Sequence, residues 1–155
     1  DLEKIKTSEK FRPVIKNSYL ISCFFNEDIQ NKKSLWEYNF FSRETKNISS
    51  FVVDNNEVIL KNTDLLLNKK EAPEELLLGN LKLNEKEAIA IINYFLLRKY
   101  KDEKVSKIIT TIEMDKTIVW NLVLLLKNLK MINVRISDKT SEIIEDRIIS
   151  PFNFK

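Results

Sequence analysis

The side chains that most often do chemistry in enzymes are nearly absent from this sequence. It has no histidine, which removes the commonest general base and the commonest ligand of transition metals. Its only cysteine, Cys23, lies between Ser22 and Phe24 in an apolar run, where a buried structural thiol is expected rather than a nucleophile. A single cysteine also gives neither an intramolecular disulfide nor a pair of metal-binding thiols. We therefore predict no catalytic residues and no metal site.

Glycine is equally scarce. Gly79 is the only one, whereas loops that cradle phosphates need several glycines where backbone N–H groups approach the ligand. Nucleotide-binding loops of the Rossmann and P-loop types are therefore excluded. We predict no cofactor and no small-molecule substrate.

Carboxylates gather in the predicted turns, where paired acids could serve a hydrolase or bind calcium. The spacing Asp-x-Asp-x-Asp-Gly does not occur, and turn aspartates ordinarily cap the backbone, so a structural role is favoured. These residues are Asp54, Glu57, Asp138, Glu142, Glu145 and Asp146.

Aromatic residues at every second position form the other group with functional potential. Trp36, Tyr38 and Phe40 alternate with polar neighbours, which places the three rings on one face of a strand. If they were exposed, the rings could anchor a protein partner or stack nucleobases. A strand with one apolar face normally buries it, so we expect the rings to be part of the core.

One helix and two groups of strands must position these residues. Asn84 and Glu87 have the spacing of a capping box, and an apolar stripe through Ala88 and Ile92 predicts a helix over residues 85–100. Alternating and β-branched runs predict strands at 18–25, 35–40, 48–53 and 57–60 before the helix. Similar runs predict strands at 105–112, 117–126, 131–137 and 142–144 after it. The fold class predicted is α+β, with antiparallel sheet packed on one main α-helix.

The two groups of strands predict two related halves within one compact domain, residues 1–155. An N-terminal hairpin half (14–60) is joined by a connector (61–83) to a C-terminal half of helix and hairpin (84–150). A shift that places Trp36 on Trp120 also places Ile48 on Ile132 and Asp54 on Asp138. This correspondence indicates an internal repeat.

The C-terminal half carries motifs of a known family. Lys86-Glu87-Ala88-Ile89 opens the helix, residues 120–126 match a middle strand, and residues 134–144 match a closing Ile-Asp-x-x-Thr-Gly-x-Ile signature. The chain thus resembles the PepSY family, best over residues 84–146. A degenerate second copy lies around 36–59, with its helix missing or damaged by Pro13. The resemblance implies an α+β fold and a function in binding and regulating partner proteins.

Two turns depart from the family pattern. Ser141 replaces the turn glycine, so the turn must adopt another geometry if the match is true. Asn56 stands at the corresponding turn of the second copy, and asparagine tolerates positive φ better than most residues.

We predict a non-enzymatic, PepSY-like module that binds and regulates another protein, although the sequence does not identify the residues that contact the partner. One alternative is a winged-helix DNA-binding protein with helices at 85–100, 102–113 and 115–129 and a wing at 133–145. Against it, residues 118–126 are apolar apart from Asn121, and β-branched residues disfavour these helices. Another alternative is a structural subunit of a larger assembly.

The charge pattern favours a protein over nucleic acid as the partner. The formal net charge is only +3, lysines alternate with acids in residues 1–10, 31–33 and 68–75, and no basic block is free of acids. The longest apolar run, residues 118–126, is much shorter than the ~20 residues of a membrane-spanning helix. A cytoplasmic location is slightly favoured. Because Asp1 is not an initiator methionine, an exported or membrane-anchored form with a removed leader is the alternative.

Overall fold

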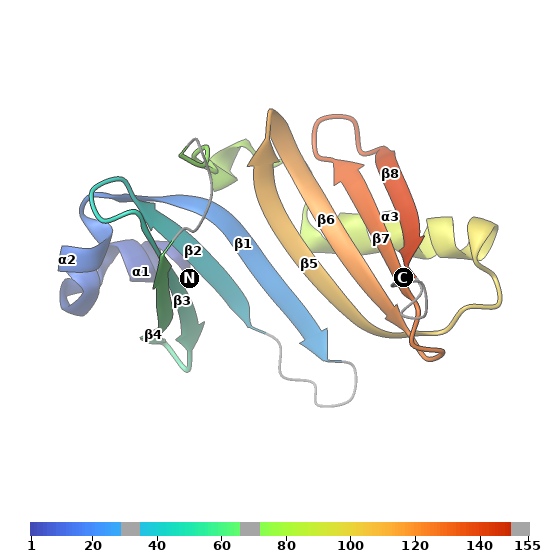
Figure 1. Cartoon of the computed structure of the whole chain (residues 1–155), viewed down its shortest axis with the longest axis horizontal. Coiled ribbons are helices and arrows are strands. Elements are labelled where there is room, and N and C mark those ends of the chain that lie inside the picture. Colours follow the sequence, from blue (N-terminus) through green and yellow to red (C-terminus); the bar gives the residue numbers. More distant parts are fainter. Residues whose placement is uncertain (29–34, 66–71, 150–155) are drawn as a thin grey trace.

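The computed structural model describes residues 1–28, 35–65 and 72–149 (Figure 1). In these residues eight strands form one antiparallel sheet with the order β4-β3-β2-β1-β5-β6-β7-β8. The strands are β1 (Ser18–Asp28), β2 (Trp36–Ser42), β3 (Asn47–Asp54), β4 (Glu57–Leu65), β5 (Val105–Asp115), β6 (Thr117–Leu126), β7 (Met131–Ser137) and β8 (Ile143–Ile149). The helices are α1 (Leu2–Thr7), α2 (Arg12–Ile15) and α3 (Glu85–Lys99), with 3₁₀ turns η1 (Glu9–Phe11) and η2 (Leu78–Asn80).

The predicted α+β class is wrong, because strands dominate the molecule. Among the described helices only α3, with 15 residues, is longer than six residues, and all eight strands belong to a single sheet. Several strands also exceed their predicted lengths: β1 reaches Asp28, β5 reaches Asp115, and β4 reaches Leu65, inside the predicted connector. Polar residues at these ends predicted turns, but pairing with a neighbouring strand extended the ladder instead.

Helix α3 confirms the predicted helix and its capping box. The Asn84 side chain accepts a hydrogen bond from the Glu87 N–H at 3.1 Å, and the Glu87 carboxylate accepts one from the Asn84 N–H at 2.8 Å. The other two helices of the winged-helix alternative are wrong, since residues 105–115 and 117–126 form strands. Their many β-branched side chains fit a pleated sheet better than a helix. No described helix is both long enough and apolar enough to span a membrane.

Each half of the sheet has a helical segment followed by four antiparallel strands. The N-terminal helical segment is neither missing nor disrupted by Pro13, which lies in the first turn of α2, where a missing N–H breaks no helical hydrogen bond. Trp36 and Trp120 lie on the same face of the sheet. Ile132, however, belongs to the buried core, whereas Ile48 faces the opposite side from the core residues Phe51 and Val53. The alignment of the two halves is therefore out of register by one residue in this strand. An internal duplication remains a prediction.

A row of apolar side chains crosses all eight strands on the face of the sheet that the helices cover, here called the covered face. Pairs of β1 and β5 residues, with Cys23 opposite Ile112, join the two halves at a central seam. The row consists of Leu60, Phe51, Tyr38, Cys23, Ile112, Trp120, Ile136 and Ile143. All eight belong to one hydrophobic core or pack against it.

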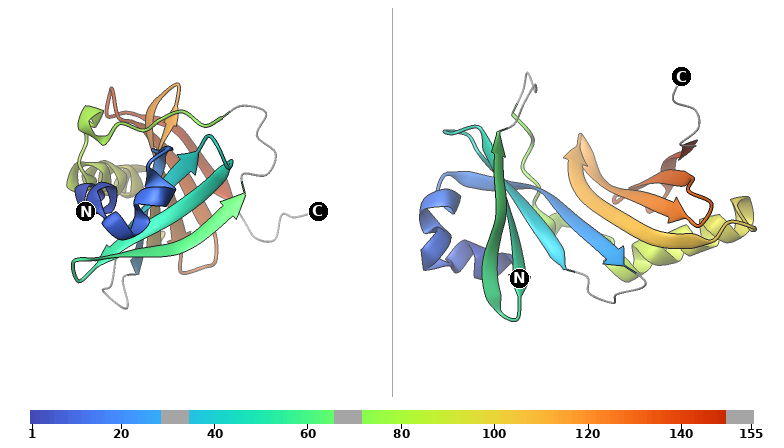
Figure 2. Two further views of the ribbon diagram at one scale, coloured as in Figure 1. Left: turned by 90° about the vertical axis from the view of Figure 1, so that its left-hand side faces the viewer. Right: turned by 60° about the horizontal axis from the view of Figure 1, so that its bottom comes forward.

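The opposite face carries no described helix. In Figure 1 the helices lie behind the sheet, and Figure 2 shows that the sheet is twisted and curved. Ile5 and Phe11 bury one end of the covered face, and Ala88 and Ile92 of α3 bury the other. The helix-free side is here called the open face. Its central row is Ile59, Val52, Glu37, Phe24, Thr111, Asn121, Arg135 and Glu145.

Candidate functional sites on the two faces of the sheet

The aromatic stripe lies on the covered face, as its predicted role in the core requires. Tyr38 and Phe40 are 9% and 2% exposed, and Phe40 packs edge-to-face with Phe51. Trp36 is only half-buried and stacks on Phe25, with 4.9 Å between the ring centroids. The stripe therefore contributes two core residues and one ring that borders a pocket.

Cys23 is buried, which confirms the predicted structural thiol. Burial raises the pKa of the thiol from 9.0 to about 12, because the protein interior disfavours the charged thiolate. Burial also raises the pKa of the adjacent Tyr38. At neutral pH Cys23 is therefore a protonated thiol and a poor nucleophile.

Asp138 confirms the structural role predicted for the turn carboxylates. One of its oxygens accepts hydrogen bonds from the Trp120 indole N–H and the Leu83 backbone N–H, both at 3.0 Å. The other oxygen accepts one from the Lys82 N–H at 2.9 Å. This buried carboxylate thus ties the β7–β8 turn to β6 and to the segment that enters α3.

The other turn carboxylates form no cluster suited to metal binding or acid–base chemistry. Asp146 accepts hydrogen bonds from Lys99 and Tyr100, and its bond raises the pKa of Lys99. Glu145 pairs with Arg135 and Arg147. Across the described ranges, no group of three or more His, Cys, Asp or Glu side chains could hold a metal ion.

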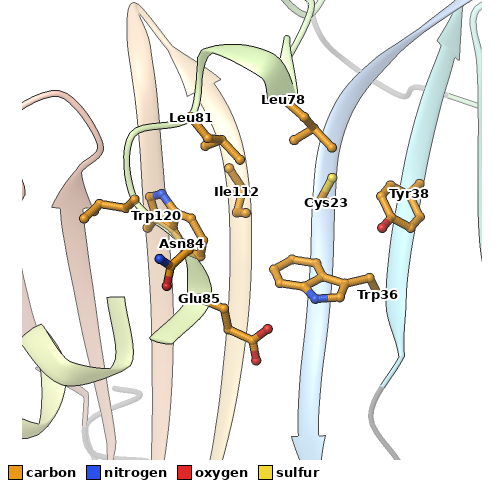
Figure 3. Close-up of a pocket in the computed structure, with 10 residues that line it drawn as sticks. Cys23, Trp36, Tyr38, Leu78, Leu81, Asn84, Glu85, Ile112 and Trp120 are labelled. Carbon is orange, nitrogen blue, oxygen red and sulfur yellow. The ribbon is translucent and has the colours of Figure 1, made fainter. Parts of the chain in front are cut away.

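A pocket of about 290 Å³ lies on the covered face, directly over the seam between the two halves. Figure 3 shows the side chains that line it. Cys23 of β1, Ile112 of β5 and Trp120 of β6 form the floor, and Trp36 and Tyr38 of β2 form one wall. The lining is mainly aromatic and aliphatic, with the side chains of Asn84 and Glu85 as polar groups, so the pocket is suited to binding a small molecule.

The segment between η2 and α3 supplies the rest of this pocket. Leu78, Leu81 and Leu83 form its roof, and Asn84 and Glu85 lie at its edge. Sequence analysis missed this site because its parts come from three separate segments. The one available signal was the pairing of Trp36 with Trp120, which are the only two tryptophans in the chain and both border the pocket.

The open face has an apolar centre although no described element covers it. Ile109 pairs with Val123 across β5 and β6, and Phe24 of β1 lies opposite Thr111, diagonally across from Ile109. These side chains are half-buried, whereas the alternate residues of β5 and β6 on the covered face are largely buried. A hollow of about 280 Å³ adjoins Phe24 and is bordered by Glu37, Val52 and other residues.

The charged residues of the open face are largely paired with one another. Arg135 forms ion pairs with Asp115 at 2.5 Å and with Glu145 at 3.4 Å, and Lys61 pairs with Glu37 at 3.0 Å. The Arg135 hydrogen bond lowers the pKa of Asp115. These pairs leave little unbalanced positive charge on the face.

Asparagine side chains lie between the apolar and charged residues of this face. The side-chain carbonyl oxygens of Asn26, Asn121 and Asn133 are buried, and none accepts a hydrogen bond from another described residue. All three residues are on the open face, in register with Ile109, Thr111 and Val123. An unsatisfied buried acceptor costs about 1–3 kcal/mol, so each of these oxygens lowers the stability of the folded protein.

Comparison with known proteins shows a likeness of fold. The structure resembles that of a candidate lipoprotein from Clostridium difficile 630, with a TM-score of 0.61 and 12% sequence identity. The likeness covers 90% of this chain and 88% of the other. No protein-family model matches the chain, and no curated protein matches it. These findings concern the architecture alone.

Proposed function

We propose that this chain is a protein-binding module and that the open face of its sheet is the binding surface. The observation that supports this most is the apolar Ile109–Val123 pair, with Phe24 diagonal to Ile109, on a face that no described helix covers. An antiparallel sheet that faces water on one side usually has polar residues there. Apolar side chains at the centre of a face with charged residues around them are instead typical of protein interfaces.

The paired charges favour a protein over nucleic acid as the partner. Nucleic acid requires basic groups that are free to replace the counterions of the phosphates. On the open face Arg135, Arg147 and Lys61 each contact a carboxylate of the same face. The PepSY-like regulatory role remains part of the proposal and is supported by the sequence motifs at residues 86–89 and 134–144.

The proposal is tested by substituting one aliphatic residue on each side of the molecule with lysine. Val123→Lys places a charge in the centre of the open face, and Leu97→Lys makes the matched change on α3, where Leu97 is 69% exposed. Proteins retained by the immobilised chain from lysate of the source cells are identified, and the affinity of the purified partner is measured for each variant. We expect Val123→Lys to weaken binding at least about tenfold, since burying an unpaired charge is costly.

Leu97→Lys should bind like the wild type, and circular dichroism should show both variants folded. If Leu97→Lys abolished binding and Val123→Lys did not, the binding surface would lie on the helical side. A retained protein unaffected by either variant would also contradict the assignment.

A structural role in a larger assembly is the second candidate. The observation that favours it is strand β8, which pairs with β7 alone among the described strands and exposes Ile144 and Ile148 by 54% and 46%. Such a strand edge can pair with another chain. We expect Ile148→Lys to disperse any oligomer seen by light scattering, whereas a wild-type monomer at all concentrations would argue against this role.

A further inference from the structure

We propose a second binding site, the seam pocket of the covered face, and infer that it takes a small organic cation. The apolar body of the ligand would occupy the space over Cys23 and Ile112, and its ammonium group would lie beside Glu85 at the edge. This site is on the other side of the sheet from the proposed protein-binding surface and does not depend on it.

The size and lining of the pocket define the body of the ligand. Its volume of about 290 Å³ lies just below the usual range for ligand pockets, about 300–1,000 Å³, so the ligand is small. The walls are mainly aromatic and aliphatic, with Trp36, Tyr38 and Trp120 around the space in Figure 3. Such a lining favours a compact apolar group, for instance a single ring.

The charge at the edge defines the head group. Glu85 begins α3 and extends toward the pocket in Figure 3. Within the described part of the chain it has neither an ion pair nor a side-chain hydrogen bond, unlike Glu87, which completes the capping box. A cation at this position can form an ion pair with the carboxylate and a cation–π interaction with the neighbouring aromatic rings. An anion would be repelled, and a neutral ligand would use neither interaction.

The walls of the pocket are held in place before any ligand arrives. The Trp120 indole N–H is fixed by Asp138, and the same carboxylate binds the backbone N–H groups of Lys82 and Leu83 beside the roof. Stacking on Phe25 holds Trp36, and the Leu76 N–H donates to the Leu20 carbonyl oxygen at 2.7 Å. Binding therefore requires little ordering of the protein, which favours affinity.

Intrinsic fluorescence reports directly on this site, because Trp36 and Trp120 are the only tryptophans in the chain. The full chain is titrated with benzylamine, benzyl alcohol and benzoate, which share a ring and differ in charge, and calorimetry repeats each titration. We expect benzylamine to shift the tryptophan emission at about millimolar concentration, since a ligand of this size has few atoms to contribute affinity. Benzyl alcohol should bind about five- to tenfold more weakly, and benzoate should not bind.

Three variants separate charge recognition from simple filling of the pocket. Glu85→Gln should reduce benzylamine binding to the level of benzyl alcohol. Glu57→Gln, which removes a carboxylate at the start of exposed strand β4, should leave it unchanged. Leu81→Phe, which narrows the roof, should weaken both ligands.

Equal binding of all three probes, or equal effects of Glu85→Gln and Glu57→Gln, would overturn the preference for a cation. The absence of both an emission change and a calorimetric signal at 20-fold the expected concentration would overturn the site itself. Neither result would bear on the open face, whose test uses different variants and a different readout.

Discussion

At the scale of single residues, the turns of this sheet use left-handed backbone without glycine. Ser141 has φ 60°, Leu129 has φ 67°, and Asn55 and Asn56 have φ 49° and 68°. For residues with a Cβ atom this conformation costs roughly 1–2 kcal/mol, and asparagine tolerates it best. Asn56 therefore serves as a physical substitute for glycine. Ser141 stands where the family pattern has glycine, and it adopts the positive φ itself.

Replacing Ser141 with glycine should stabilise the protein. Ser141→Gly removes the strain at φ 60°, and part of this gain is offset by the greater freedom of glycine in the unfolded chain. We expect the free energy of unfolding to rise by about 0.5–1 kcal/mol in urea denaturation. Thr140→Gly, one residue earlier and without positive φ, is the control and should lower stability. A loss of stability in Ser141→Gly would mean that the serine side chain contributes more than its backbone strain costs.

The buried thiol of Cys23 predicts that stability falls in alkaline solution. Its pKa is about 12 in the folded protein against an ordinary 9.0, so the folded state keeps a proton that the unfolded chain releases above pH 9. The contribution is therefore complete below pH 9 and is lost as the pH rises toward 12, with a limiting slope of about 1.4 kcal/mol per pH unit. Urea denaturation between pH 7 and pH 10 should show this decline.

Cys23→Ala should show a shallower decline over the same interval, since Tyr38 and the other groups remain. The comparison concerns slopes rather than absolute stabilities, because the substitution also leaves a small cavity. Identical slopes in the two proteins would show that the thiol does not set the alkaline limit.

At the scale of elements, Asp138 connects three parts of the chain that sequence places far apart. Asp138 follows β7. Its carboxylate accepts hydrogen bonds from an N–H group of β6 and from two N–H groups of the segment that leads into α3. This junction positions both the start of α3 and the roof of the seam pocket. The segment that leads into α3 is therefore held to the C-terminal strands through Asp138.

Asp138→Ala should be strongly destabilising and should also change the pocket. Loss of the carboxylate leaves buried N–H groups of Trp120 and Leu83 without an acceptor, which predicts a loss of about 2–4 kcal/mol. Urea denaturation gives the stability, and a shift in tryptophan emission at low urea reports the loosened indole. Asp54→Ala, in the turn that sequence matched to Asp138, is the comparison. Equal losses in the two variants would show that burial of Asp138 has no special role.

Local signals predicted local structure well at this scale. The capping box at Asn84 and the apolar stripe through Ala88 and Ile92 are complete within one segment, so α3 could be predicted with its N-terminus. The strand cores could be predicted for the same reason, because alternation needs no distant partner. The ends of β1, β4 and β5 could not, because polar residues there are kept extended by neighbouring strands.

The candidate sites depend on contacts that no local pattern encodes. The seam pocket exists because β1 pairs with β5, an arrangement that brings Cys23 against Ile112 across more than half the chain. The open face was missed for a related reason. Phe24, Ile109 and Val123 were predicted as strand residues, but only the sheet order shows that they share a face that no described helix covers.

At the scale of the whole molecule, the row of apolar side chains across eight strands makes the two halves one structure. The two halves share one sheet, because β1 of the first half is paired with β5 of the second at the centre. Separation of the halves would expose the seam edges and uncover Cys23 and Ile112. A continuous core of this kind favours unfolding in a single cooperative transition.

This continuity predicts that a destabilising substitution at the seam lowers the stability of strands in both halves of the sheet. Ile112→Ala leaves a cavity at the centre of the row and should lower the free energy of unfolding by about 2–4 kcal/mol. Amide hydrogen exchange should then show equal losses of protection in β3 and β7, one strand from each half, because their slowest amides exchange through the same global opening. Leu97→Ala, on the exposed side of α3, should change neither strand. If β7 lost protection while β3 kept it, the halves would unfold separately, and the continuous sheet would be two cooperative units joined at a weak seam.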